Sequence, residues 1–193
     1  EAGKLAGTVT LVVRDGKVIH RKAVGLMDIG TSKPMTDDAI FRIYSMTKPV
    51  TTAAAMMLAE EQKLALDDPV SKFLPELKGL RVYVGPDGET AAAEREVSIR
   101  DLMRHTSGFT YGLFSDTPVD RLYRKRAIFT RGGTLPSFVT KLSTVPLLNQ
   151  PGIRFHYGVS TDVLGRVVEV VSGQRLDEFF SERIFKPLDM VDT

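Results

Sequence analysis

Residues 41–49 read Phe41-Arg42-Ile43-Tyr44-Ser45-Met46-Thr47-Lys48-Pro49 and lead directly into the clearest helical pattern of the first third of the chain. Apolar residues then recur at helical spacing, at Val50, Ala53, Ala54, Met57 and Leu58. Proline is tolerated only in the first turn of a helix, so Pro49 places the helix start near Ser45 or Met46. Residues i and i+3 share a helix face, which allows the hydroxyl of Ser45 to meet the amine of Lys48.

The pairing of serine and lysine carries a chemical meaning. A serine hydroxyl is a weak nucleophile until a neighbouring base takes its proton. Lys48 can be that base if burial or nearby positive charge lowers its pKa from a value of about 10.4. The start of a helix also favours negative charge on the oxygen of Ser45. Taken alone, the motif is weak and more often indicates an N-cap serine followed by a solvated lysine.

Upstream of this helix, the sequence predicts a β-hairpin. Residues 8–13 are β-branched and apolar, residues 14–17 contain an Asp-Gly turn signal, and residues 18–24 return as a second strand. Residues 25–40 suggest an irregular connection, and residues 40–43 a short extended piece. A lone hairpin does not make a stable sheet, and no later segment plainly supplies the missing strands.

Downstream, the chain is mostly helical. Asp67-Asp68-Pro69 should cap a short helix that ends before Pro75, and residues 81–97 predict a polar loop or a ragged hairpin. Ser98 with Asp101 resembles a capping box for a helix that runs to about His105 and is closed by Gly108. Further helices are predicted at residues 118–129, 135–143, 160–172 and 177–185.

Composition and charge exclude several classes of protein. Of the 193 residues, 42% are hydrophobic and 26% charged, the balance of a soluble globular protein. The net charge is only +2. One basic cluster stands out, which we interpret as a solvated helix face rather than a nucleic-acid site. Its members are Arg121, Arg124, Lys125, Arg126 and Arg131.

Absent residue types narrow the chemistry further. The sequence has no cysteine, which excludes disulfides, thiolate zinc sites and a cysteine nucleophile. The histidines, His20, His105 and His156, lack metal-ligand spacing, so no metal site is expected, and His105 is interpreted as structural. No organic cofactor is expected either. No apolar run is long enough to span a membrane. The compartment is undecided, with the cytoplasm slightly favoured over the periplasm, and a start without Met suggests a processed or trimmed chain.

Ordered sequence blocks along nearly the whole chain resemble the serine β-lactamase-like hydrolases. This family includes class C β-lactamases, DD-peptidases and family VIII esterases. Residues 41–49 resemble its catalytic signature, and four later blocks follow in the family's order. They are Lys63-Leu64-Ala65-Leu66-Asp67-Asp68-Pro69-Val70, Leu102-Met103-Arg104-His105-Thr106-Ser107-Gly108-Phe109, Phe155-His156-Tyr157-Gly158-Val159-Ser160-Thr161-Asp162-Val163-Leu164-Gly165 and Phe185-Lys186-Pro187-Leu188-Asp189-Met190.

The resemblance implies both a fold and a set of catalytic residues. The fold is α/β, with an antiparallel sheet flanked by helices and a mostly helical domain. Residues 1–61 would form the N-terminal part of the α/β domain with the nucleophile helix, and residues 62–193 the helical domain. Ser45 would be the nucleophile, Lys48 would help to deprotonate it, and Tyr157 would relay the proton. Without the family blocks, Tyr157 reads as an ordinary buried tyrosine.

One departure from the family pattern bears on the substrate. β-lactamases of this type usually carry an asparagine where this chain has Val159, whose side chain cannot hydrogen-bond to a substrate amide. The interval from Ser45 to Tyr157 is also long for a class C enzyme. We therefore expect a carboxylesterase acting on small esters with short acyl chains. The alternatives are a β-lactamase or DD-peptidase, and, from another class, an inactive penicillin-binding-like binding module. Tyr111, Phe114 and Val159 are the predicted substrate contacts.

A second departure concerns completeness. The family's third motif, Lys-Thr-Gly, His-x-Gly or Trp-x-Gly, lies on a strand that supplies one amide of the oxyanion hole, and none follows Tyr157 here. Loss of one such donor typically costs about 2.7–4 kcal/mol of transition-state stabilisation. We therefore expect this chain to be the N-terminal portion of a longer enzyme, weakly active at most without its missing C-terminal segment.

Overall fold

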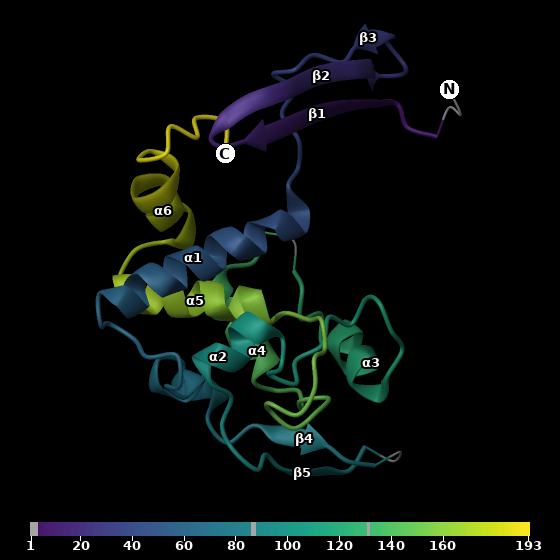
Figure 1. Cartoon of the computed structure of the whole chain (residues 1–193). Helices are drawn as coiled ribbons and strands as arrows, with labels where there is room; N and C mark the ends of the chain where they lie inside the picture. Colours follow the sequence, from purple (N-terminus) through teal and green to yellow (C-terminus); the bar gives the residue numbers. More distant parts are fainter. Residues whose placement is uncertain (1–3, 86–87, 131) are drawn as a thin grey trace. The chain divides into compact units, whose positions relative to one another are not determined.

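The computed structural model describes residues 4–85, 88–130 and 132–193 (Figure 1). The chain divides into two compact units, Glu1–Tyr44 and Ser45–Val191. All the predicted site residues belong to the second unit. The expected boundary at residue 61, between an α/β domain and a helical domain, stays a prediction for the whole protein.

The first unit is a three-stranded antiparallel sheet in the order β1-β2-β3. Strand β1 (Gly7–Arg14) pairs with β2 (Lys17–Asp28), which confirms the predicted hairpin. Its turn residues, Asp15 and Gly16, have φ angles of 49° and 71°, as a two-residue type I′ turn requires. The two-residue strand β3 (Lys33–Pro34) lies within the stretch expected to be irregular.

The second unit is built around two long helices. Helix α1 (Thr47–Glu60) follows a 3₁₀ turn at Tyr44–Met46 and packs along α5 (Ser160–Ser172) (Figure 1). The buried face of α1 is made largely of small residues, Thr51, Ala54 and Ala55, which lets the two helices approach closely. Both helices occur where the periodicity predicted them, and Gly173 ends α5 at a φ of 73°.

Shorter elements surround this pair. The helices are α2 (Ile99–Arg104), α3 (Pro118–Lys125), α4 (Leu135–Leu142) and α6 (Leu176–Phe180), the last continued by a π-helical turn at Ser181–Phe185. Strands β4 (Arg81–Tyr83) and β5 (Thr90–Ala92) form the ragged hairpin expected in residues 81–97. The chain after Asp67-Asp68-Pro69 forms 3₁₀ turns at Val70–Lys72 and Pro75–Leu77.

Two helix predictions need comment. The capping box of Ser98 and Asp101 at the start of α2 is confirmed, and Thr117 with Asp120 forms another at the start of α3. The expected helix at residues 118–129 was too long. It ends at Lys125 because Ala127 adopts a left-handed φ of 45°, which turns the chain away.

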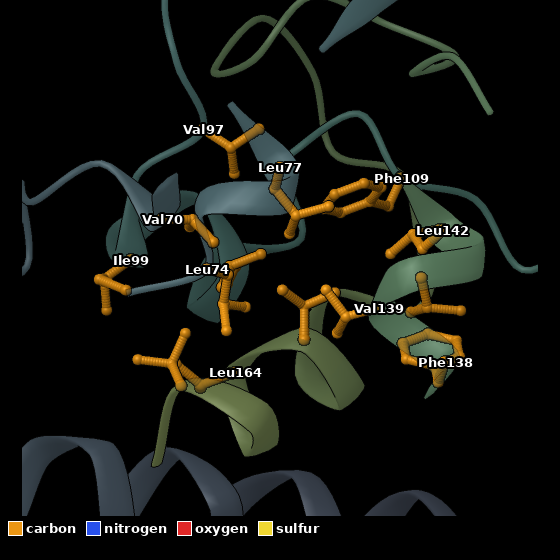
Figure 2. Close-up of a cluster of buried hydrophobic side chains, with 14 of the residues drawn as sticks. Val70, Leu74, Leu77, Val97, Ile99, Phe109, Phe138, Val139, Leu142 and Leu164 are labelled. Carbon is orange, nitrogen blue, oxygen red and sulfur yellow. The ribbon is translucent and has the colours of Figure 1, made fainter. Parts of the chain in front are cut away.

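One hydrophobic core, shown in part in Figure 2, holds the second unit together. Each of its labelled side chains is at most 9% exposed. They are Val70, Leu74, Leu77, Val97, Ile99, Phe109, Phe138, Val139, Leu142 and Leu164. Because Phe109 and Leu164 come from the segments that carry the later sequence blocks, the core fixes the positions of those blocks.

The basic cluster is partly neutralised. Arg121 and Arg124 both form ion pairs with Asp116, and Arg124 also donates to the carbonyl oxygen of Gly112. Arg131 lies outside the described residues. Within the described ranges, no helix is both long and apolar enough to cross a bilayer.

Candidate active site

The structure brings together the three residues predicted to be catalytic. The hydroxyl oxygens of Ser45 and Tyr157 are joined by a 2.6 Å hydrogen bond, and Lys48 Nζ donates to Ser45 Oγ at 3.4 Å. The Lys48 ammonium also lies 4.8 Å from the centre of the Tyr157 ring. Each of the three groups therefore contacts the other two.

Helix packing explains this convergence. Ser45 lies in the 3₁₀ turn before α1, and Lys48 is in the first turn of that helix. Tyr157 is in the loop that enters α5, the partner of α1. The next residue must be small, because a Cβ on Gly158 would lie 2.5 Å from the carbonyl oxygen of Phe109. This close backbone contact fixes the distance between the segment that carries Tyr157 and the segment that carries Phe109.

The electrostatics shift the pKa values of Lys48 and Tyr157 in opposite directions. Partial burial lowers the pKa of Lys48, but hydrogen bonding to Tyr157 and nearby negative charge outweigh it and raise the pKa above 10.5. Hydrogen bonds from Lys48 and Ser45 lower the pKa of Tyr157 below 10. The lowered pKa that Lys48 would need to act as the base is therefore not found, and Tyr157 is the group whose ionisation is made easier.

Aromatic rings surround Tyr157. Tyr111 stacks on it, with ring centres 5.7 Å apart, and Phe114 lies at 6.3 Å. The Lys48 ammonium is 5.7 Å from the Tyr111 ring. Both loop aromatics thus lie beside Tyr157, and their role as substrate contacts stays a prediction. Val159 differs, because its side chain is completely buried, and contact with a substrate would require it to be uncovered.

Sequence reasoning assigned no role in the site to two residues that lie in this constellation. Asp162, in the first turn of α5, is half-buried; burial raises its pKa, and its charge acts on Lys48, Tyr111 and Tyr157. His105, interpreted as structural, packs against Tyr157 with ring centres 4.9 Å apart. Burial and the charge of Lys48 lower its pKa. The signal for both was their presence in the family-like blocks.

A hollow lies next to these aromatics. Its volume is 340 Å³, and its lining includes Phe129, Phe138 and Asp162. The ring of Phe129 stacks on Tyr111 at 5.6 Å, so one chain of rings runs from the hollow to Tyr157. An apolar group of modest size fits a space of this volume and lining.

Comparisons with known proteins agree with the fold. The sequence model of the Beta-lactamase family matches residues 1–193. Protein Rv1367c of Mycobacterium tuberculosis (strain ATCC 25618 / H37Rv) is 41% identical over 196 residues, covering 100% of this chain and 48% of that protein. Esterase EstB of Burkholderia gladioli is 36% identical over 191 residues, covering 98% of this chain and 47% of its own.

A solved structure gives the same result. EstCE1, described as a hydrolase with promiscuous acyltransferase activity, superposes with a TM-score of 0.83 at 36% identity. The match covers 97% of this chain and 48% of EstCE1. The chain thus spans about half the length of the relatives it matches and has the β-lactamase-like α/β fold, an antiparallel sheet with helices. It belongs to the beta-lactamase family, as its ordered sequence blocks predicted.

Proposed function

We propose that the protein is a serine hydrolase that is acylated at Ser45 and acts on small carboxylic esters. The observation that carries this proposal is the 2.6 Å hydrogen bond between Ser45 and a Tyr157 whose pKa is lowered beside Lys48. A phenolate held against a serine hydroxyl by an ammonium ion is an activated nucleophile pair.

The proposed reaction uses the ionised form of Tyr157, which Lys48 and Ser45 favour by lowering its pKa. The Tyr157 phenolate takes the proton of Ser45 as Oγ attacks the ester carbonyl carbon. When the tetrahedral intermediate collapses, the phenol returns that proton to the departing alcohol. Water then gives a proton to Tyr157 and attacks the acyl-enzyme. As the second tetrahedral intermediate collapses, the Tyr157 phenol returns that proton to Ser45 Oγ, and the carboxylic acid is released. The ammonium of Lys48 stabilises the phenolate each time it forms.

Two facts favour esters over lactams. Val159 replaces the asparagine of the β-lactamase motif and is buried, so it offers no hydrogen bond to a lactam amide. EstB, a relative that aligns with nearly the whole chain, is named an esterase. Transfer of the acyl group to an alcohol is the second candidate, because EstCE1 combines hydrolysis with acyl transfer. In that reaction an alcohol replaces water in the second step.

The rest of the active site is proposed to come from a further segment of the protein. The relatives are about twice as long as this chain, since it covers 47–48% of them. That segment would supply the second oxyanion donor, which the sequence lacks after Tyr157. No cofactor takes part in this mechanism.

The experiment uses the full-length protein and a serine-reactive fluorophosphonate. We expect Ser45 to be labelled, Ser45→Ala to abolish labelling, and Ser143→Ala, which changes a half-buried serine at the end of α4, to leave it intact. A short-chain nitrophenyl ester should be hydrolysed faster than a cephalosporin. A folded protein that is not labelled at Ser45 would identify it as a binding module, and preferential turnover of the cephalosporin would identify a β-lactamase.

A further inference from the structure

Thr110 is bound on three sides. Its hydroxyl donates to Asp120 Oδ1 at 2.5 Å and lies 3.1 Å from His156 Nε2. Its carbonyl oxygen accepts the backbone N–H of Val159 at 3.3 Å. His156 and Val159 stand on either side of Tyr157 in the chain. A single residue therefore holds the tyrosine's segment from both directions.

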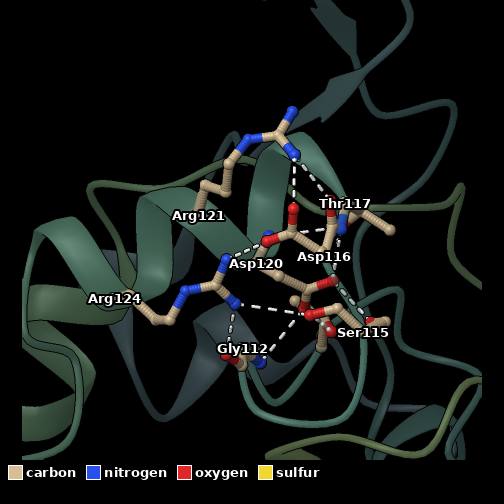
Figure 3. Close-up of polar contacts among 8 residues, drawn as sticks. Gly112, Ser115, Asp116, Thr117, Asp120, Arg121 and Arg124 are labelled. Atoms are coloured by element: carbon tan, nitrogen blue, oxygen red, sulfur yellow. Dashed lines mark hydrogen bonds and ion pairs between the residues drawn. The ribbon is translucent and has the colours of Figure 1, made fainter.

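Asp120 anchors Thr110. This carboxylate is completely buried, and Figure 3 shows the polar groups gathered around it. It accepts hydrogen bonds from Gly112 N at 3.1 Å, Ser115 Oγ at 2.5 Å, Thr117 N at 2.9 Å and Thr117 Oγ1 at 2.6 Å. Burial raises the pKa of Asp120, but these donors and Thr110 outweigh it and bring the pKa to about 2. Asp120 is therefore an anion at any working pH.

The charge of Asp120 fixes the direction of the chain of hydrogen bonds. A carboxylate can only accept, so Thr110 must give it the hydroxyl proton. The oxygen of Thr110 is then free to accept from His156 Nε2–H, which selects that tautomer. Burial lowers the pKa of His156, in keeping with a neutral ring. The order is thus His156 to Thr110 to Asp120, with each group oriented by the next.

The same carboxylate also orders the aromatic loop. Gly112, whose amide it binds, directly follows Tyr111, the ring that stacks on Tyr157. Gly112 has a φ of 75°, and a Cβ there would lie 2.7 Å from Tyr123 Cβ, so the loop is closely packed at this point. We infer that Thr110 and Asp120 are positioning residues, which set the place of the base Tyr157 and of its stacking partner Tyr111. This inference rests on the proposed function.

The competing explanation is that Asp120 only caps α3. The structure contains an internal control for it. Asp101 occupies the same capping-box position in α2 and is also buried, and Thr106 donates its hydroxyl to Asp101 Oδ1 at 2.9 Å. In the described part of the chain, the Thr106 hydroxyl makes no second hydrogen bond comparable to that of Thr110 with His156. The hydroxyls of the two threonines differ in their link to His156, the residue before Tyr157, and not in their link to a cap.

The test compares Thr110→Val with Thr106→Val in the full-length protein. Valine keeps the volume and removes the hydroxyl. We expect both variants to lose similar thermal stability. Only Thr110→Val should lower kcat, at least about tenfold with little change in KM, because displacing a reacting group by about 1 Å already has large effects. Thr110→Ser, which keeps the hydroxyl, should restore kcat.

The pH profile separates positioning from simple destabilisation. A displaced Tyr157 loses contact with Lys48 and Ser45, so its pKa should rise and the acid limb of kcat/KM should move to higher pH in Thr110→Val alone. The other titratable groups that face Tyr157 are Tyr111 from the loop, His105 from the end of α2 and Asp162 from α5. These side chains are the same in both variants.

Each remaining outcome is decisive. Equal losses of kcat in the two valine variants, or an acid limb that does not move, would overturn the positioning role. If Thr110→Val does not fold, His156→Leu must show the shift and His156→Gln, which keeps an N–H donor, must not. A wild type that fluorophosphonate fails to label rejects the proposed function along with the inference. A labelled wild type and a Thr110→Val variant labelled at the same rate reject the inference alone.

Discussion

The hydroxyls of Ser45 and Tyr157 lie 2.6 Å apart although 112 residues separate them in the chain. Neither residue is in the body of a long helix. Each lies just before one, Ser45 ahead of α1 and Tyr157 ahead of α5, and these two helices pack together. The contact between the hydroxyls is therefore a product of helix packing, and its disturbance should be visible in the chemistry.

Removal of the Tyr157 hydroxyl removes the proposed base and should lower the rate of ester hydrolysis. Tyr157→Phe keeps the ring and its stacking but leaves Ser45 without an acceptor, so kcat should fall by about 10²–10⁴-fold. Steady-state ester hydrolysis by the full-length protein measures this. Tyr83→Phe is a suitable control, since its buried hydroxyl has no hydrogen-bond partner among the described residues and it lies on β4. Comparable losses in both variants would contradict the assignment.

The rate should depend on pH in a window set by two groups. Tyr157 must lose its proton, and its pKa is lowered from 10, so kcat/KM should rise as the pH passes the lowered pKa of Tyr157. Lys48 must keep its proton, and its pKa lies above 10.5, so the rate should fall again only beyond it. In Lys48→Met the pKa of Tyr157 should move upward and carry the acid limb with it. An unmoved limb would exclude Tyr157 as the titrating base.

Acid should destabilise the fold through two buried carboxyls. Asp101 and Asp120 each have a pKa of about 2, against 3.8 when unfolded. As the pH falls, the unfolded chain binds protons before the folded protein does. The contribution of these two carboxylates to the free energy of unfolding is therefore complete above pH 3.8 and is lost as the pH falls toward 2. The loss amounts to about 2 kcal/mol for each group.

Denaturant unfolding at a series of pH values checks this. Asp101→Asn and Asp120→Asn should each be less stable at neutral pH and should show a flatter decline in acid. Asp177→Asn, which changes an exposed carboxylate, provides the comparison. A wild type whose free energy of unfolding stays constant from pH 5 to 2 would refute the stabilising role of the carboxylates.

A methyl group at residue 158 should harm both stability and rate. In Gly158→Ala the new Cβ would meet the backbone of Phe109 at 2.5 Å, and the loop carrying Tyr157 would have to move. Overpacking of this kind typically costs about 1–3 kcal/mol. Gly30→Ala is the matched control, because its nearest contact would be 3.4 Å. The melting temperature and the rate of ester hydrolysis should be measured on the same variants. A Gly158→Ala protein that is less stable but hydrolyses the ester at the wild-type rate would contradict the prediction.

The sequence predicted those parts of the structure that depend on local pattern. The hairpin turn at Asp15-Gly16, the start of α1 near Ser45 and the capping box of Ser98 all follow from neighbouring residues. The helix at residues 118–129 was overestimated because its end depends on a left-handed residue, Ala127, that carries no glycine-like signal.

Charge states were beyond the reach of local pattern. Whether the pKa of Lys48 falls or rises depends on the balance between burial and the groups around it, and Asp162 and Tyr157 reach it only through the packing of α5 on α1. The contact of Thr110 with His156 is equally non-local, since 46 residues separate them. The family resemblance brought Tyr157 to attention, but it did not show what holds it in place.

Asp120 has a consequence for how this region folds. It accepts hydrogen bonds from the backbone N–H groups of Thr117, at the start of α3, and of Gly112, within the aromatic loop. Neither amide can exchange with solvent unless the same buried carboxylate is released. The helix and the loop should therefore open as one cooperative unit, and hydrogen exchange should give both amides the same free energy of opening.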